Sequence, residues 1–133
     1  MPLTPGLRAE VRIVVAEEDT ASAIGSGDVP VLATPRLLAL AEAATVAAIK
    51  DHLEPGTTSV GTSVMLEHKA ASPVGAEVVT LAQLTEVDRR RLVFNVEANE
   101  GDKQIGAARV ERFIVDRRQF LDRLDGRGRS APP

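Results

Sequence analysis

The feature that most constrains this chain is one long apolar segment with clear ends. Thr34 followed by Pro35 is typical of a helix N-cap with proline at the first helical position, and Glu54-Pro55-Gly56 ends a helix about twenty residues later. Between these ends nearly every position is Leu, Ala, Val or Ile. A helix that is apolar almost all round must be covered on most of its sides, so we expect it at the centre of the fold.

The composition fits one small domain without a metal site. Of the 133 residues, 44% are hydrophobic and 26% are charged, as in ordinary globular proteins. There is no Cys, and His52 and His68 lie in different contexts, so we expect no disulfide framework, no metal site and no bound cofactor. A net charge of -3 and only three aromatic residues argue against nucleic-acid binding.

The same apolar segment is not a membrane span. Arg36, Glu42 and Lys50 interrupt it, and it falls short of the roughly 20 uninterrupted apolar residues that cross a bilayer. The first ten residues also lack the basic segment and apolar core of a secretory signal. We therefore expect a cytoplasmic protein with no membrane partner.

Five segments alternate apolar and polar residues with the period of a strand. They are residues 7–17, 58–70, 76–87, 90–99 and 104–116, and the last four are separated by turn residues that predict a meander of antiparallel hairpins. Residues 19–30 are small, polar and Gly-rich, which predicts a loop and a flexible cover. The polar residues 126–133 predict a disordered tail.

One helix and five strands together predict an α+β protein. An antiparallel sheet of about five strands wrapped around one long hydrophobic helix is the hotdog fold, here as a single domain over residues 1–125. Such a sheet leaves one long edge open, and pairing with a second copy covers that edge. We therefore expect a homodimer, with a tetramer as the alternative.

Three ionisable residues are predicted to face inward. Glu42 lies in the middle of the apolar helix, where a carboxylate must be neutralised, hydrogen-bonded or placed on a narrow solvent-facing stripe. Strand alternation places His68 on the same side as Val60 and Leu66, where a core histidine without function is the alternative. Arg112 alternates with apolar residues in the last strand, and a guanidinium there needs an anionic group or a partner subunit.

Thr34 and Glu42 cannot meet within one helix. Eight residues at 1.5 Å each separate them by about 12 Å along the axis. Thr34 is explained as an N-cap, although a hydroxyl at a helix N-terminus can also contact a substrate. If both residues serve one reaction centre, a substrate must lie between them, or two chains must each supply part of the site.

Glycines and arginines supply further candidates. Gly61 and Gly106 interrupt strand patterns, which indicates either a bulge or a close approach to the backbone. Residues 89–91 are three consecutive arginines, which predict a solvated turn or a site for the phosphates of a nucleotide-bearing substrate.

An ordered set of segments resembles one known family. It comprises VLAT at 31–34, Glu42, LEPGTTSVGT at 53–62, His68 followed by AASPVG, and VERF at 110–113. These segments, with their spacing over about residues 30–120, resemble the fluoroacetyl-CoA thioesterase family of hotdog enzymes. The resemblance implies hydrolysis of a short acyl-CoA thioester. It also implies that Thr34, Glu42 and His68 are catalytic and that Gly61 and Arg112 lie at the substrate.

The chain departs from that family in one segment. The fluoroacetyl-specific enzyme carries Phe residues before the VxAT motif, as a lid over the fluorinated group, whereas this chain has DTASAIGSGDVP and no Phe before Phe94. Selectivity for a fluorinated substrate is therefore not implied.

Three functions remain for such a chain. The first is an acyl-CoA thioesterase, with Glu42 as nucleophile or general base, His68 in proton transfer, Thr34 in orientation and a backbone N–H near Gly61 on the oxyanion. The second is a binding module for acyl-CoA or another small ligand without turnover. The third, an enoyl thioester hydratase, would require a different His and Asp context on the helix.

Overall fold

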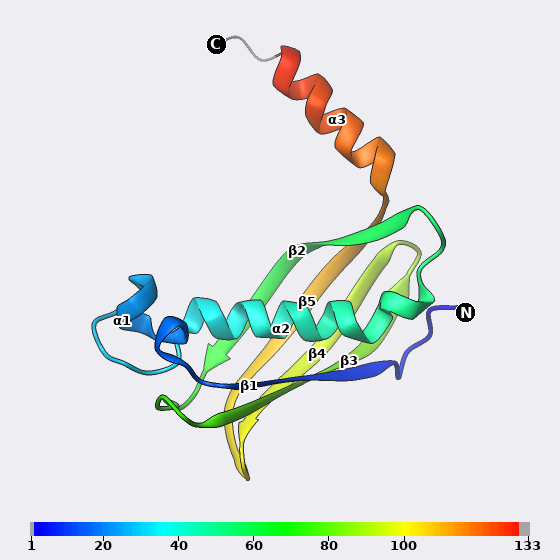
Figure 1. The fold of residues 1–133 in the computed structure, drawn as a ribbon. Helices are drawn as coiled ribbons and strands as arrows, with labels where there is room; N and C mark the ends of the chain where they lie inside the picture. The colour runs from blue at the N-terminus through cyan, green and yellow to red at the C-terminus, as the bar shows by residue number, and fades with distance from the viewer. Residues whose placement is uncertain (1, 131–133) are drawn as a thin grey trace.

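The computed structural model describes residues 2–130 and contains one sheet, one long central helix and several shorter helical segments (Figure 1). In chain order the elements are β1 (Arg8–Val14), η1 (Glu17–Asp19), α1 (Ala21–Ile24), α2 (Thr34–Ile49), η2 (Lys50–His52), β2 (Thr57–His68), β3 (Glu77–Asp88), β4 (Arg91–Glu100), β5 (Lys103–Asp116) and α3 (Arg117–Ser130). The predicted strands and central helix are all present.

Helix α2 lies across one face of an antiparallel sheet whose strand order is β1-β3-β4-β5-β2 (Figure 1). Apolar side chains of both layers form the core between them, among them Leu37, Leu40, Ile49, Leu84 and Phe94, each at most 2% exposed. The α+β class and the arrangement of one helix against five strands are therefore confirmed.

The predicted meander of four strands is wrong in one respect. Strand β2 pairs with β5, and β3 lies between β1 and β4. The linker between β2 and β3 makes other bonds: the Leu32 N–H donates to the Ser72 carbonyl, and the Gly75 N–H donates to the Val15 carbonyl. These bonds tie the linker to the segment before α2. The linker crosses from β2 at one edge of the sheet to β3 near the other edge, so β2 does not pair with β3 and is an edge strand.

A bulge in β2 changes which side chains face the helix. The register with β5 shifts between Gly61, which pairs with Arg112, and Ser63, which pairs with Glu111. One extra residue reverses the alternation, so Gly61 and His68 both lie on the helix-facing side although one number is odd and the other even. The prediction that Val60 shares the face of His68 is wrong, because Val60 precedes the bulge and pairs with the exposed Phe113.

Helix α2 begins differently from the prediction. Thr34 is its first residue, and Ala33 occupies the N-cap position without a side-chain bond. The Thr34 hydroxyl is not a cap because it hydrogen-bonds the His68 ring instead. The helix is also less completely covered than expected, since Ala39, Ala43 and Val46 are exposed along one stripe.

Two segments predicted as irregular contain helices. The predicted loop over residues 19–30 includes α1, which Gly25 ends with a φ of 82° in the left-handed region. The predicted disordered tail from residue 126 is helical as far as Ser130 in α3, where the Asp116 carboxylate accepts the Gln119 N–H in the first turn. Residues 131–133 of that tail lie outside the described residues. Within residues 2–130, no helix has both the length and the apolarity to cross a membrane.

Gly106 provides a test of the packing between α2 and the sheet. A Cβ at this position would lie 2.9 Å from Leu37 Cδ2 and 3.2 Å from the Glu67 carbonyl oxygen. We expect Gly106→Ala to lower the free energy of unfolding by about 1–3 kcal/mol, because the added methyl overfills the contact. Urea denaturation measures this change.

Gly126→Ala is the matched control, since a Cβ there meets nothing within 4 Å. It should change stability by less than about 1 kcal/mol, in the direction of higher helix propensity. Equal stability of the Gly106→Ala variant and the unmodified protein would contradict the close packing of α2 at this point.

Candidate active site

Thr34 and His68 form the first half of the site. The Thr34 Oγ1 and His68 Nδ1 atoms lie 2.8 Å apart, where the first residue of α2 meets the last residue of β2. Burial lowers the pKa of His68 from its ordinary value, although the Ala70 backbone opposes this shift. The His68 Nε2 atom is buried without a partner among the described residues. This histidine is therefore suited to be neutral and to exchange a proton.

A hollow of about 300 Å³ opens beside this pair. Residues 19–30, which include α1 and are called the α1 segment below, and the chain after β2 supply most of its wall. The wall consists of Ala21, Ser26, Val31, Leu32, Thr34, His68, Lys69, Ala70 and Ala71. Most of these side chains are small, so the cover over Thr34 and His68 lacks bulky groups. The segment predicted as a cover therefore does border the site.

Glu42 and Arg112 form the second half. The Arg112 Nη1 atom donates to Glu42 Oε2 at 3.3 Å, while Arg112 Nε donates to the Ser59 hydroxyl at 2.8 Å and Nη2 to the Ser59 carbonyl at 3.1 Å. Arg112 is only 6% exposed, and burial lowers its pKa while the Glu42 charge raises it. The guanidinium is thus fixed on three sides and holds one oxygen of a half-buried carboxylate.

Gly61 is required by the position of Glu42. A Cβ built on Gly61 would collide with Glu42 Oε2 and lie 3.4 Å from Arg112 Nη1. Only glycine lets the carboxylate approach the β2 backbone this closely. Of the two readings of Gly61, a bulge and a close approach, the structure contains both.

The two halves are separate within one chain. Thr34 and Glu42 lie eight residues apart on the same straight helix, about 12 Å along its axis. His68 and Gly61 are likewise seven residues apart on β2, with the bulge between them. The sequence predicted Thr34, Glu42, Gly61, His68 and Arg112 as site residues, and the structure brings them together as a pair and a trio.

Sequence analysis missed Ser59 and Asp19. Ser59 orients Arg112, and the missing signal was the register of the part of β2 that precedes the bulge. Asp19 is 8% exposed, and its carboxylate accepts the Arg36 Nε–H at 2.8 Å and the Ala16 N–H at 2.8 Å. Burial raises the pKa of Asp19, but the bonds from Ala16 and Arg36 outweigh it and the net shift is downward. Asp19 thereby ties η1 to the first turn of α2.

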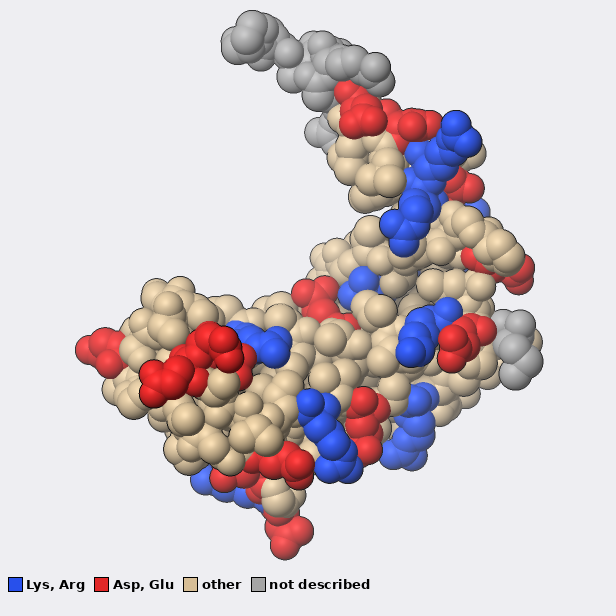
Figure 2. All heavy atoms as spheres, in the orientation of Figure 1, with Lys and Arg blue, Asp and Glu red and all other residues tan. Residues whose placement is uncertain are grey.

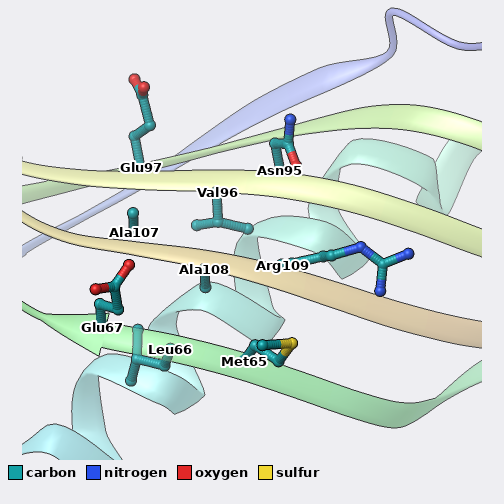
Figure 3. A pocket seen from close by; sticks show the side chains of 9 residues that line it. All are labelled: Met65, Leu66, Glu67, Asn95, Val96, Glu97, Ala107, Ala108 and Arg109. Atoms are coloured by element: carbon teal, nitrogen blue, oxygen red, sulfur yellow. The ribbon is translucent and has the colours of Figure 1, made fainter.

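A second hollow lies on the other face of the sheet and contains none of these residues. It has a volume of about 610 Å³ and is lined by Met65, Leu66, Glu67, Asn95, Val96, Glu97, Ala107, Ala108 and Arg109 (Figure 3). The side chains of Glu97 and Asn95 point away from α2 on this face of the sheet. Among residues 2–130, no cluster of three His, Asp or Glu residues is placed to hold a metal ion.

Comparison with known proteins identifies the family. The family model described as fluoroacetyl-CoA-specific thioesterase matches residues 15–118. The chain belongs to this family. A fluoroacetyl-CoA thioesterase of Streptantibioticus cattleyicolor is 39% identical over 90 residues, which are 68% of this chain and 65% of that relative's length. The chain thus spans just under two thirds of the curated relative it matches.

Solved structures agree with this assignment. A structure of the fluoroacetyl-CoA thioesterase FlK is 30% identical in sequence. The alignment covers 99% of this chain and 100% of the FlK chain, with a TM-score of 0.88. A hot-dog-like protein from Thermanaerovibrio acidaminovorans, at 18% identity, covers 98% of this chain and 96% of its own with a TM-score of 0.87, which supports the fold. The predicted family and the predicted hotdog fold are both confirmed.

The half-buried ring of His68 leads to a prediction about pH. We expect its NMR titration midpoint to lie below the ordinary histidine value, because burial disfavours the charged form. The unfolded chain then binds this proton more readily than the native state. The free energy of unfolding should therefore fall as the pH is lowered from above the ordinary histidine pKa toward the lower pKa of His68 in the folded protein.

The measurement is an NMR titration of the His52→Gln variant, which retains a single histidine. A midpoint at or above the ordinary value would contradict the burial of His68.

Proposed function

We propose that this protein hydrolyses acyl-CoA thioesters to a free acid and CoA. The observation that carries the proposal is the Glu42 carboxylate, held by Arg112 against the Gly61 backbone at an open sheet edge. A carboxylate in that setting can attack a carbonyl carbon or activate a water molecule. Membership of a thioesterase family supports the same reaction.

The active centre is shared between two copies of the chain. Within residues 2–130, strand β2 has β5 on one side and no strand on the other, so its outer edge is open to a second β2. Antiparallel pairing of the two β2 strands would bring the Gly61 region of one copy toward the His68 end of the other. The exposed stripe of α2 beside Glu42, which includes Val46, is then available to the partner.

The reaction divides between the two halves. Glu42 of one copy attacks the thioester carbonyl or takes the proton of the attacking water, and a backbone N–H near Gly61 binds the oxygen that becomes negative. His68 of the other copy carries the proton that the CoA thiolate needs to leave, while Thr34 fixes the orientation of its ring. Arg112 keeps Glu42 in place. Water supplies the oxygen of the acid and the proton of the thiol.

The acyl group is small, and fluorine is not required. The hollow beside Thr34 and His68 holds about 300 Å³ and is walled by small side chains. Ile24 is the only bulky apolar residue in helix α1, and its side chain is 45% exposed. We therefore assign a short acyl-CoA as substrate, without selection for a fluorinated acyl group.

Thiol release tests this function. Purified protein is incubated with a panel of short and medium acyl-CoAs, and free thiol is followed with a colorimetric reagent, which the Cys-free chain does not consume. Glu42→Gln should lower the turnover number by about 10²- to 10⁴-fold, since it removes the reacting carboxylate but keeps its shape. Glu97→Gln, on the exposed outer face of the sheet, should retain full activity.

Two results would contradict the proposal. Equal activity of Glu42→Gln and Glu97→Gln would remove Glu42 from the reaction. Silence with every acyl-CoA, combined with saturable CoA binding, would instead establish a non-catalytic binding module.

A further inference from the structure

Helix α3 stands away from the domain and has an uncovered apolar side. Figure 2 shows open space between this helix and the body of the molecule. Leu121 and Leu124, one turn apart on α3, are 49% and 46% exposed. An apolar stripe of this kind on a projecting helix favours a partner surface.

The α1 segment presents a second uncovered apolar patch. Ile24 is 45% exposed and Val29 is 51% exposed. Both lie in the same segment as Ala21 and Ser26, which line the hollow beside Thr34 and His68. Figure 1 shows α1 and α3 at opposite ends of the molecule, so the two patches cannot cover each other within one chain.

The end of the molecule at α1 is acidic, and the first turn of α3 is basic, although Asp122 and Asp125 are also exposed on α3. Glu17, Glu18 and Asp28 are exposed in or beside η1 and α1, and Figure 2 shows acidic side chains gathered at that end. Arg117, Arg118 and Arg123 are exposed on α3. Within the described residues, none of these six forms an ion pair. Opposite charges left unpaired around two apolar patches favour contact between those surfaces.

Helix α3 and the α1 segment lie at opposite ends of strand β2. Helix α3 leaves the domain at the start of β2, where the Arg117 N–H donates to the Gly56 carbonyl at 3.0 Å and Thr57 pairs with Asp116. The α1 segment lies at the other end of β2, beside His68. In an antiparallel pair of β2 strands, the start of each strand lies next to the end of the other.

We infer that α3 of each copy packs on the α1 segment of a second copy and covers the hollow beside that copy's Thr34 and His68. With 14 residues, α3 is about 21 Å long, enough to extend over the neighbouring copy. Leu121 and Leu124 pack against Ile24 and Val29, and the basic first turn of α3 meets the acidic cluster. The partner thereby supplies a cover that the small side chains of α1 do not. This inference rests on the homodimer proposed above.

Cysteine cross-linking tests the contact, since the chain has no Cys of its own. Ile24→Cys and Leu121→Cys are prepared as separate proteins, mixed under conditions that exchange subunits, and treated with a short bismaleimide. We expect a covalent dimer in the mixture that exceeds, by at least about tenfold, any dimer from either variant alone. The control mixture pairs Leu121→Cys with Val14→Cys, a residue that is 61% exposed on the opposite edge strand.

Sedimentation of the same samples separates the possible failures. A dimer in solution that gives no link between positions 24 and 121, or equal linking with the Val14→Cys control, would overturn the inference alone. A monomer at every concentration would overturn both the inference and the shared active centre. The thiol-release assay would still report independently on hydrolysis by Glu42.

Discussion

The length of helix α2 between Thr34 and Glu42 is the constraint on which the site depends. A helix is rigid along its axis, so these two side chains stay about 12 Å apart whatever happens around them. Each has a partner on β2 or β5 at its own end: His68 for Thr34, and Gly61 with Arg112 for Glu42. One chain therefore holds the two halves of the candidate site apart, and the edge of β2 that has no strand beside it within residues 2–130 runs past both.

The bulge in β2 makes this arrangement possible. If all seven steps from Gly61 to His68 alternated regularly, without a bulge, these two residues would lie on opposite faces of the sheet. The bulge turns both toward α2 while the strand keeps its pairing with β5. The buried Arg112 then spans the gap between Ser59 and Glu42 and orients the carboxylate. A local irregularity of the backbone thus sets the chemistry of the site.

Sequence patterns predicted the elements and the charged inward-facing residues well, because apolar periodicity is a strong local signal. Proline and glycine at the ends of the central helix marked it within a few residues. The patterns failed where a long-range contact decided the outcome. Thr34 carries the local signature of an N-cap, yet its hydroxyl bonds a histidine 34 residues away. The pairing of β2 with β5 and the β2 bulge likewise depend on the partner strand rather than on β2 itself.

The two half-sites could not be related from sequence for the same physical reason. Spacing showed that Thr34 and Glu42 cannot touch, but the place of Gly61 beside Glu42 and of His68 beside Thr34 follows from strand register. The resemblance to a thioesterase family pointed to five residues without giving their geometry. Ser59 and Asp19 were missed because their roles appear only in the folded contacts.

Subunit mixing tests the shared active centre most directly. Glu42→Gln and His68→Ala, each expected to have little activity on its own, are mixed in equal amounts under conditions that exchange subunits. If each centre takes Glu42 from one copy and His68 from the other, every heterodimer contains one intact centre, and the mixture recovers about a quarter of the unmodified thiol release. Activity that stays at the level of the separate variants, despite proven subunit exchange, would contradict a centre built from two chains.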